Sequence, residues 1–311
     1  MKIILSVLLT AITIQFAKAQ NGNITGSVQD ENGRLLHFVA IEDNKYQNVA
    51  FTDSLGNFTI PVHPDSKLQF ALEGYRDTLF TAGKISETPQ VILKSYAKVP
   101  VETFNLSLHP FTRADGLLVP VAQKPNQVGS RYMFDGFSHG FIIDASGNLV
   151  SNPYYLFDYE KVSGLLLLTV DKKNVKAVVK EQVKSFTIYN NVDERFNFER
   201  VPAIDKIRYV QVLATGKKYK ICKLITTKFV PADFENTASG GAGNDFDEYV
   251  DNAEYYVLNV QNDQLHKLAL RKKSIKDDFN EDADKVDKFL TDNSGKIDEP
   301  YLSNLGNYMN Q

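Results

Sequence analysis

The sequence has a single cysteine and no tryptophan among its 311 residues. One thiol excludes an internal disulfide, so the folded chain must depend on its hydrophobic cores. With 43% hydrophobic residues and a length typical of two domains, the chain has enough apolar material for two such cores. Cys222 lies in an alternating segment, residues 219–224, which favours a buried small side chain over a reactive thiol.

An excess of charge of one sign is also absent. The chain has 35 basic and 38 acidic residues, a net charge of -3, and no long run of like charges. A basic surface for nucleic acid is therefore missing, and we expect no nucleic-acid partner. No histidine has the His-x-x-Glu or His-Glu-x-x-His spacing of a zinc peptidase, so the sequence predicts no metal site and no cofactor.

Long hydrophobic runs are missing except at the N-terminus. Lys2 precedes an apolar run over residues 3–16, and Ala17-Lys18-Ala19 has the small-x-small pattern of a cleavage site. The pattern predicts a signal peptide at residues 1–19, with an N-terminal membrane anchor as the alternative. Because no second long run follows, we expect no transmembrane segment in the mature chain. The expected location is outside the cytoplasm, in the periplasm or extracellular at the cell surface.

Short alternating segments separated by turn residues fill residues 23–94. They predict the strands of a seven-stranded β-sandwich at 24–28, 35–41, 48–52, 57–62, 68–72, 78–81 and 91–93. Turn residues such as Asp30 to Gly33 and Asp53 to Gly56 separate these strands, and a glycine there can adopt a positive φ.

Three spaced motifs of this region agree in order with one family: Gly26-x-Val28-x-Asp30-x-x-Gly33, Thr52-Asp53-x-x-Gly56-x-Phe58 and Phe70-x-x-x-Gly74-Tyr75. They resemble the carboxypeptidase regulatory-like domain, a transthyretin-like sandwich, over about a quarter of the chain. The resemblance implies that Phe58 and Tyr75 fill the inter-sheet core. In that family the module is typically a non-catalytic part of exported bacterial proteins, including peptidases and outer-membrane receptors. The resemblance therefore implies export and a fold, without a reaction.

Residues 95–130 contain four scattered prolines and several large apolar residues, which predict an ordered connector. A β-rich region follows at residues 131–270. Its predicted strands form an antiparallel β-meander, curved or closed, at 141–144, 149–150, 154–159, 165–170, 175–179, 185–189, 209–214, 219–229, 255–260 and 265–270. The region is similar to exported bacterial proteins with the same N-terminal sandwich, a resemblance that implies no function.

The apolar period changes to about three and a half after Leu270. Residues 271–311 are predicted to form two C-terminal α-helices, separated at Gly295, with Asp298 before Pro300 opening the second. We expect these helices to cover the open end of the meander; a partner-binding helix is the alternative. The fold class is therefore mainly β, with a sandwich, a meander and two helices.

Two short motifs invite a catalytic or metal-binding interpretation. Residues 136–140 read Gly-Phe-Ser-His-Gly, but a strand pattern follows this G-x-S-x-G where a hydrolase requires a helix. A bend near a strand start is the better interpretation. Residues 240–245 resemble one calcium-binding nonapeptide, yet only one copy occurs. We expect residues 231–252 to form a mobile solvated loop, with adventitious calcium binding as the alternative.

One stretch pairs carboxylates with aromatic side chains, as carbohydrate sites do. Tyr154, Tyr155, Asp158 and Tyr159 are the candidate ligand-binding residues, and no catalytic residue is predicted. The leading hypothesis is a non-catalytic exported protein that acts in binding or assembly with an envelope protein or a glycan. The alternatives are a hydrolase, peptidase or glycosidase, with catalytic residues in 131–270, and a glycan- or peptide-binding module.

Overall fold

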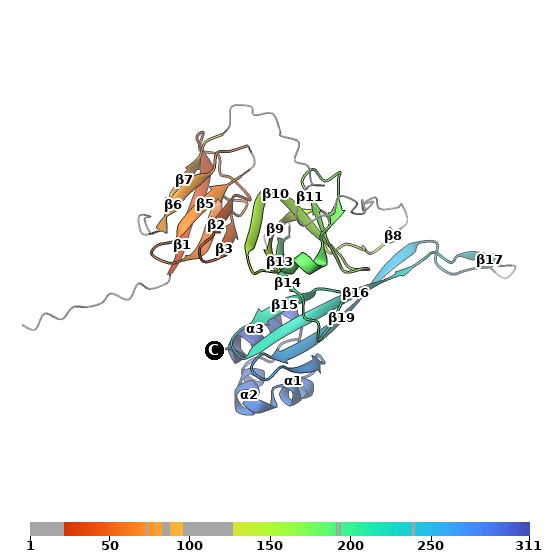
Figure 1. Ribbon diagram of the computed structural model, residues 1–311. Helices are drawn as coiled ribbons and strands as arrows, with labels where there is room; N and C mark the ends of the chain where they lie inside the picture. Colours follow the sequence, from red (N-terminus) through yellow and green to blue (C-terminus); the bar gives the residue numbers. More distant parts are fainter. Residues whose placement is uncertain are drawn as a thin grey trace, which may run out of the picture. The chain divides into compact units, whose positions relative to one another are not determined.

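The structure, a computed structural model, describes residues 22–72, 74–82, 88–95, 127–190, 192, 194–237 and 240–311. The predicted signal peptide and nearly all of the predicted connector lie outside these residues. The chain forms two compact units (Figure 1). The first contains Met1–Phe70 and Asp77–Lys94, and the second contains Ala71–Arg76 and Ser95–Gln311.

The first unit is a β-sandwich of seven strands, as the turn spacing predicts. The strands are β1 (Gly22–Asp30), β2 (Ala40–Asp43), β3 (Asn48–Phe51), β4 (Asn57–Val62), β5 (Lys67–Ala71), β6 (Thr78–Thr81) and β7 (Gln90–Leu93). They form two sheets, in the orders β4-β1-β7 and β3-β2-β5-β6. Phe58 of one sheet meets Phe70 of the other edge to face, with ring centroids 5.4 Å apart. Aromatic contacts of this kind fill the space between the sheets.

Two details of the first unit differ from the predictions. The strand predicted from Leu35 begins only at Ala40, because Phe38 has a positive φ of 56° that interrupts the extended backbone. The Thr52 hydroxyl adds two hydrogen bonds to the backbone ones that Phe38 and Val39 make with Thr52. It donates to the Leu36 carbonyl at 2.6 Å and accepts from the Val39 N–H at 2.9 Å. Tyr75, expected in the core, is only partly buried.

The second unit is built on one eleven-stranded sheet, in the order β12-β11-β10-β9-β13-β14-β15-β16-β19-β20 with β8 beside β19. All neighbours are antiparallel except β8, and most follow one another in the chain, so the predicted meander is confirmed. The strands are β8 (Gln127–Val128), β9 (Ser138–Asp144), β10 (Leu149–Glu160), β11 (Leu165–Thr169), β12 (Lys176–Ala177), β13 (Val183–Tyr189), β14 (Arg195–Glu199), β15 (Val210–Thr215), β16 (Tyr219–Val230), β19 (Asp247–Asn259) and β20 (Gln264–Leu268).

Three strand predictions in this unit are wrong. The separate strands at 149–150 and 154–159 are one strand, β10, whose register against β9 shifts between Ser151 and Leu156. Strand β14 was not predicted. The predicted loop 231–252 contains the hairpin β17 (Glu235–Thr237) and β18 (Gly240–Ala242) and the first residues of β19. The register shift in β10 and the polar sequence of residues 231–252 both interrupt the alternation of apolar and polar residues on which strand prediction depends.

The sheet of the second unit has two large cores along its length and two smaller buried clusters. The first is rich in aromatic side chains: Tyr155, Phe157, Tyr159, Phe186 and Phe198 are all buried in it. The second lies between the β15–β20 part of the sheet and the C-terminal helices. Strands β14 and β15 join the two parts through only two residue pairs, Phe198 with Gln211 and Glu199 with Val210. Cys222 is buried on β16, as predicted, where it belongs to a smaller cluster with Val210 and Leu224. Burial raises the pKa of its thiol to about 12.

Three helices follow the sheet, where two were predicted. They are α1 (Lys272–Asp278), α2 (Ala283–Asp292) and α3 (Glu299–Met309), and a 3-10 turn at Asn280–Asp282 separates the first two. Asp298 caps α3 as predicted, because its Oδ1 accepts the Tyr301 N–H at 3.1 Å. The helices cover a face of the sheet, where Leu302 packs with Ile221 and Val257, and not an open end. No helix in the described ranges is long and apolar enough to cross a membrane.

Candidate functional site

The predicted ligand-binding residues lie on β10, and the structure divides them between its two faces. Tyr155 and Tyr159 are buried in the first core of the second unit. Asp158 belongs to the opposite face and is only 2% exposed, whereas Tyr154 is 38% exposed. Because side chains alternate along a strand, these four residues cannot line one cleft. They do not form the exposed aromatic patch that glycan or peptide binding at this place requires.

The carboxyl group of Asp158 is buried, where the loss of hydration destabilises its charged form. Its Oδ1 accepts the Tyr159 N–H at 2.7 Å and the Phe134 N–H at 3.3 Å. Burial raises the pKa of Asp158 from 3.8 to about 7, although these hydrogen bonds and the charge of Lys161 act in the other direction. The carboxyl group therefore changes its charge near neutral pH.

Glu160, on the same face of β10, is buried and engaged on both oxygens. Its Oε1 accepts the Val162 N–H at 3.1 Å and lies 3.2 Å from the Nε of Arg131. Its Oε2 accepts the Ser163 N–H at 2.8 Å. These contacts close the turn between β10 and β11 and hold Arg131 beside it. Glu160 therefore fixes the backbone at this turn, with both of its oxygens engaged by the protein.

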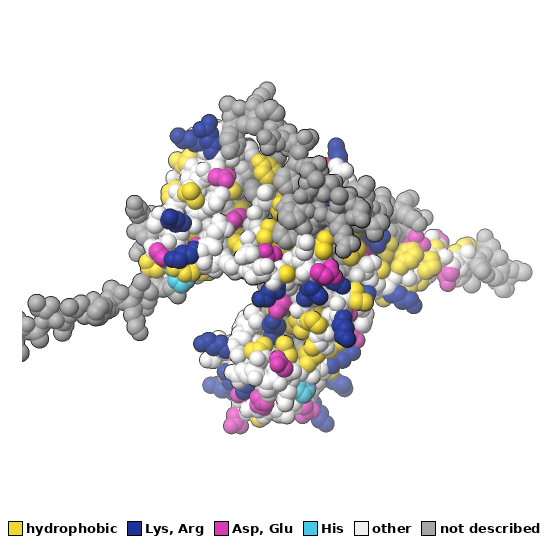
Figure 2. Space-filling model, in the orientation of Figure 1, with side chains coloured by type: hydrophobic (Ala, Val, Ile, Leu, Met, Phe, Trp, Pro, Cys, Tyr) yellow, Lys and Arg dark blue, Asp and Glu magenta, His cyan; other side chains and the backbone are white. Residues whose placement is uncertain are grey.

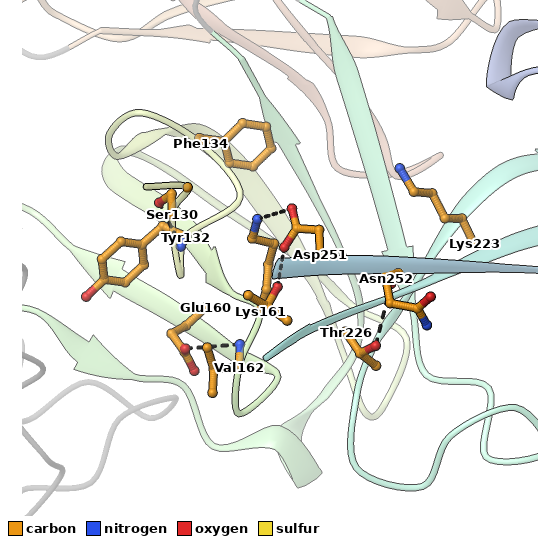
Figure 3. A network of polar contacts seen from close by, with 12 residues as sticks. Ser130, Tyr132, Phe134, Glu160, Lys161, Val162, Lys223, Thr226, Asp251 and Asn252 are labelled. Carbon is orange, nitrogen blue, oxygen red and sulfur yellow. Dashed lines mark hydrogen bonds and ion pairs between the residues drawn. The ribbon is translucent and has the colours of Figure 1, made fainter. Parts of the chain in front are cut away.

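Lys161 connects this turn to the distant strand β19. Its side chain is buried, and its Nζ lies 2.6 Å from Oδ2 of Asp251. The other oxygen of Asp251 accepts a hydrogen bond from the Thr227 hydroxyl of β16 at 2.5 Å. Figure 3 shows Lys161 and Asp251 pointing toward each other in this network. A charge pair of this kind adds little net stability but selects one geometry, which here positions β16 and β19.

Beyond this contact β16 and β19 continue as a two-stranded arm, residues 226–252 (Figure 1). Strand β15 pairs with β16 only from Lys220 to Lys223, and β20 pairs with β19 only from Tyr255 onward. The two long strands stay paired with each other as far as Val230 and Glu248. Apart from β8 at the start of β19, no described strand pairs with the outer edges of the arm. These edges present backbone N–H and C=O groups that can pair with another strand.

Large exposed apolar side chains gather on the arm and on β8. Phe229 is 40% exposed, Val250 43%, Val128 48% and Phe234 49%. The ring of Phe229 lies against Tyr249, with centroids 5.0 Å apart. Figure 2 shows hydrophobic and acidic side chains next to each other on the arm. A two-stranded ribbon has little core of its own, and clustered apolar side chains mark contact surfaces, so the arm is the candidate functional site.

The sequence indicates only half of this arm. Alternation over residues 219–229 predicts β16, but the facing residues 247–252 contain Asp247, Glu248 and Asp251 and read as a solvated loop. The one available signal is Tyr249-Val250, two residues typical of strands that lie between the carboxylates. In the structure Tyr249 is paired with Phe229 of β16, so these two residues do belong to a strand.

The G-x-S-x-G segment lies at the start of β9, as the strand pattern predicts. Ser138 is buried at the first residue of β9, and the chain continues as a strand and not as a helix. The arrangement that exposes a nucleophilic serine is therefore missing at this segment. Gly140 has a packing role instead, because a Cβ at this position would lie 2.1 Å from the carbonyl oxygen of Thr187 on β13.

We expect Gly140→Ala to destabilise the second unit by about 3 kcal/mol, because β9 and β13 must separate to admit the methyl group. Urea unfolding followed by circular dichroism measures the loss. Gly136→Ala is the matched control, since no atom lies within 4 Å of a Cβ there. Equal stability of the two variants would show that the close approach of Gly140 to β13 is not a constraint.

The structure provides little for metal or hydrolytic chemistry in the described residues. No group of three or more His, Cys, Asp or Glu side chains that could hold a metal ion occurs among them. His266 Nδ1 lies 3.8 Å from Asp278 Oδ1, a histidine–carboxylate pair. That pair borders a small pocket that Tyr219, Asn259 and Glu281 also line. In the segment that resembles a calcium repeat, residues 240–242 form strand β18.

No protein-family model matches the chain, and no curated protein sequence matches it. Among solved structures, the major pilin subunit BcpA of Bacillus cereus is similar over 81% of this chain and 93% of its own, with 11% identity and a TM-score of 0.20. The TIE protein of Bacillus anthracis is similar over 81% of this chain and 48% of its own, with 11% identity and a TM-score of 0.19. With TM-scores this low, neither likeness assigns a function.

Proposed function

We propose that this chain is an exported, non-catalytic protein of the bacterial envelope that acts in assembly by binding a protein partner through its arm. The arm is the observation on which the proposal depends: two strands leave the sheet and carry exposed Phe229 and Val250. Apart from β8 at the start of β19, the outer edges of these strands have no described strand partner. The predicted signal peptide and the resemblance of residues 23–94 to the carboxypeptidase regulatory-like domain support export to the periplasm or the cell surface.

The edges of the arm suit one mode of recognition. An extended segment can add to a free strand edge, where backbone hydrogen bonds give affinity and side-chain pockets give specificity. On β16 the free edge begins after Lys223, where the pairing with β15 ends. The ion pair of Lys161 with Asp251 holds the base of this edge, so less conformational entropy is lost when a partner binds.

Shortening the arm tests the proposal. Thr227 and Asp251 face each other across the two strands, so residues 228–250 can be replaced by Asn-Gly, which favours a two-residue hairpin turn. This change retains the network of Lys161, Asp251 and Thr227. In affinity capture from an envelope extract with the mature protein as bait, we expect a defined protein to be retained by the full arm and lost with the short one.

A pair of point variants refines the same experiment. Phe229→Ser removes an exposed apolar side chain from the arm, and Ile207→Ser removes one that is 58% exposed elsewhere in the second unit. Both should fold, because neither side chain is buried. We expect at least about tenfold weaker capture for Phe229→Ser and no change for Ile207→Ser. Equal capture by the full and short arms would refute the arm as the binding site.

A further inference from the structure

Residues 127–134 form a strap that links the arm to the end of β10. At one end of the strap, β8 pairs in parallel with residues 247–248 of β19. Toward the other end, Tyr132 forms an antiparallel bridge with Glu160, and the Met133 N–H donates to the Tyr159 carbonyl at 2.9 Å. The strap therefore holds the arm and the end of β10 at the same time.

The strap covers part of the arm's edge. Among the described residues, β8 is the one strand that pairs with an outer edge of the arm. Gly129 lies directly on the β19 backbone, because a Cβ there would be 2.5 Å from the carbonyl oxygen of Tyr249. Strand β8 pairs through only two residues, and parallel pairing is the less stable kind. It should therefore stay on β19 only while the rest of the strap is held on β10.

Asp158 lies under the strap and fastens its far end. Its Oδ1 accepts the Phe134 N–H at 3.3 Å. Leu167 is paired beside Asp158 on the neighbouring strand, and Tyr132 of the strap packs with Leu167 in one buried cluster. Paired residues on adjacent strands share a face, so the strap covers the face to which Asp158 belongs. Opening the strap would therefore expose the Asp158 carboxyl group to water.

The ionisable groups around Asp158 come from three elements: Glu160 and Lys161 at the end of β10, Arg131 and Tyr132 of the strap, and Tyr249 and Asp251 of β19. Two ion pairs join four of them. Arg131 lies 3.2 Å from Glu160, and Lys161 lies 2.6 Å from Asp251. Asp158 forms no ion pair with a described residue. Loss of hydration raises the pKa of its carboxyl group to about 7, although the charge of Lys161 acts in the other direction.

We propose that the strap is a latch on the arm that opens when Asp158 loses its proton, and that opening uncovers the edge of β19 for a partner. The inference rests on the proposed function, because it describes how binding by the arm is regulated. Its sign follows from hydration. The closed strap keeps the carboxyl group out of water and favours the neutral form, whereas the open strap hydrates it and favours the charged form. Acid therefore closes the latch and neutral pH releases it.

Hydrogen exchange of the Met133 amide from pH 4 to pH 8 measures how often the strap opens. The comparison variant is Asp158→Asn, which keeps an oxygen for the Phe134 N–H but has no proton to lose in this range. The ratio of the two exchange rates at each pH removes the intrinsic pH dependence of exchange. The Val178 N–H, which donates to the Leu166 carbonyl at 2.8 Å outside the strap, is the internal control.

We expect the exchange rate at Met133 in the unchanged protein, divided by that in Asp158→Asn, to be near one at pH 4. The ratio should rise by up to about tenfold per pH unit, to as much as about 1000-fold at pH 7, and then stay constant. The ratio at Val178 should not change with pH. Asp171→Asn, the same substitution outside the strap, should keep the pH dependence at Met133. A ratio at Met133 that is independent of pH, or that changes equally at Val178, would overturn the inference.

Capture through the arm at pH 5 and pH 8 separates this inference from the proposed function. We expect the unchanged protein to capture its partner more strongly at pH 8, and Asp158→Asn to capture no more at pH 8 than at pH 5. Arm-dependent capture that is equal for the two proteins at pH 8 would overturn the inference and leave the proposed function standing. Opening of the strap without capture at either pH would support the latch and count against the proposed function.

Discussion

Asp158→Asn should raise the free energy of unfolding of the second unit at pH 8 by up to about 4 kcal/mol. The side chain is buried, and burial raises the pKa of its carboxyl group from 3.8 to about 7. Above pH 7 the folded protein must hold a buried negative charge. Asparagine has nearly the same shape, carries no charge, and keeps an oxygen that can accept the Tyr159 and Phe134 N–H groups.

The pH dependence follows from the direction of this shift. Below about pH 4 the Asp158 carboxyl group is neutral in both the folded and the unfolded chain, so the substitution should change little. Between pH 4 and pH 7 the unfolded chain loses the proton more readily than the folded chain, and the folded state loses stability as the pH rises. The gain from Asp158→Asn should therefore grow through this range and remain constant above pH 7.

Asp171→Asn is the control of opposite sign. Burial acts to raise the pKa of Asp171, but hydrogen bonds from the N–H groups of Asn174 and Lys173 hold it at about 2. The charged form is thus favoured in the folded state, and we expect its loss to lower stability above pH 4. Thermal unfolding from pH 4 to pH 8 measures both variants. A gain for Asp158→Asn that is equal at pH 4 and pH 8 would contradict the raised pKa.

The sequence predicts the elements of this protein best where local chemistry determines them. The turns of the first unit follow from residues such as Gly56, whose φ of 73° favours glycine. The start of α3 follows from Asp298, since a capping aspartate before a proline acts within one turn of helix. Both signals lie within a few residues, so no knowledge of distant contacts is needed.

The candidate site is harder to predict, because pairing partners determine it. On β10 the alternation separates Tyr155 and Tyr159 from Asp158, but the sequence does not show that both faces are covered. On the arm, the residues from Glu248 to Asp251 become a strand because they pair with residues 227–230 of β16. Such a strand is stabilised by its neighbour and not by its own propensity, so a local pattern cannot reveal it.

Leu302→Ala should lower the free energy of unfolding of the second unit by about 2–5 kcal/mol. Leu302 is fully buried where α3 packs on the sheet. A smaller side chain leaves a cavity that the surrounding residues cannot easily fill. Gly306 on the same helix already lies so close to the sheet that a Cβ would be 2.3 Å from the Cβ of Ala214. Because α3 has no room to move inward at Gly306, the cavity should remain open and the cost should lie in the upper part of the range.

Phe70→Ala provides the reciprocal variant, because Phe70 is fully buried in the first unit. Each unit has its own buried core, so calorimetry should resolve two transitions, and each substitution should shift only the transition of its own unit. A loss of about 3–5 kcal/mol is expected for Phe70→Ala in the first transition. Equal shifts of both transitions by either variant would mean that the two units unfold as one. In that case a change to the arm could also alter the stability of the first unit. Independent transitions instead allow the binding by the arm to be assigned to the second unit alone.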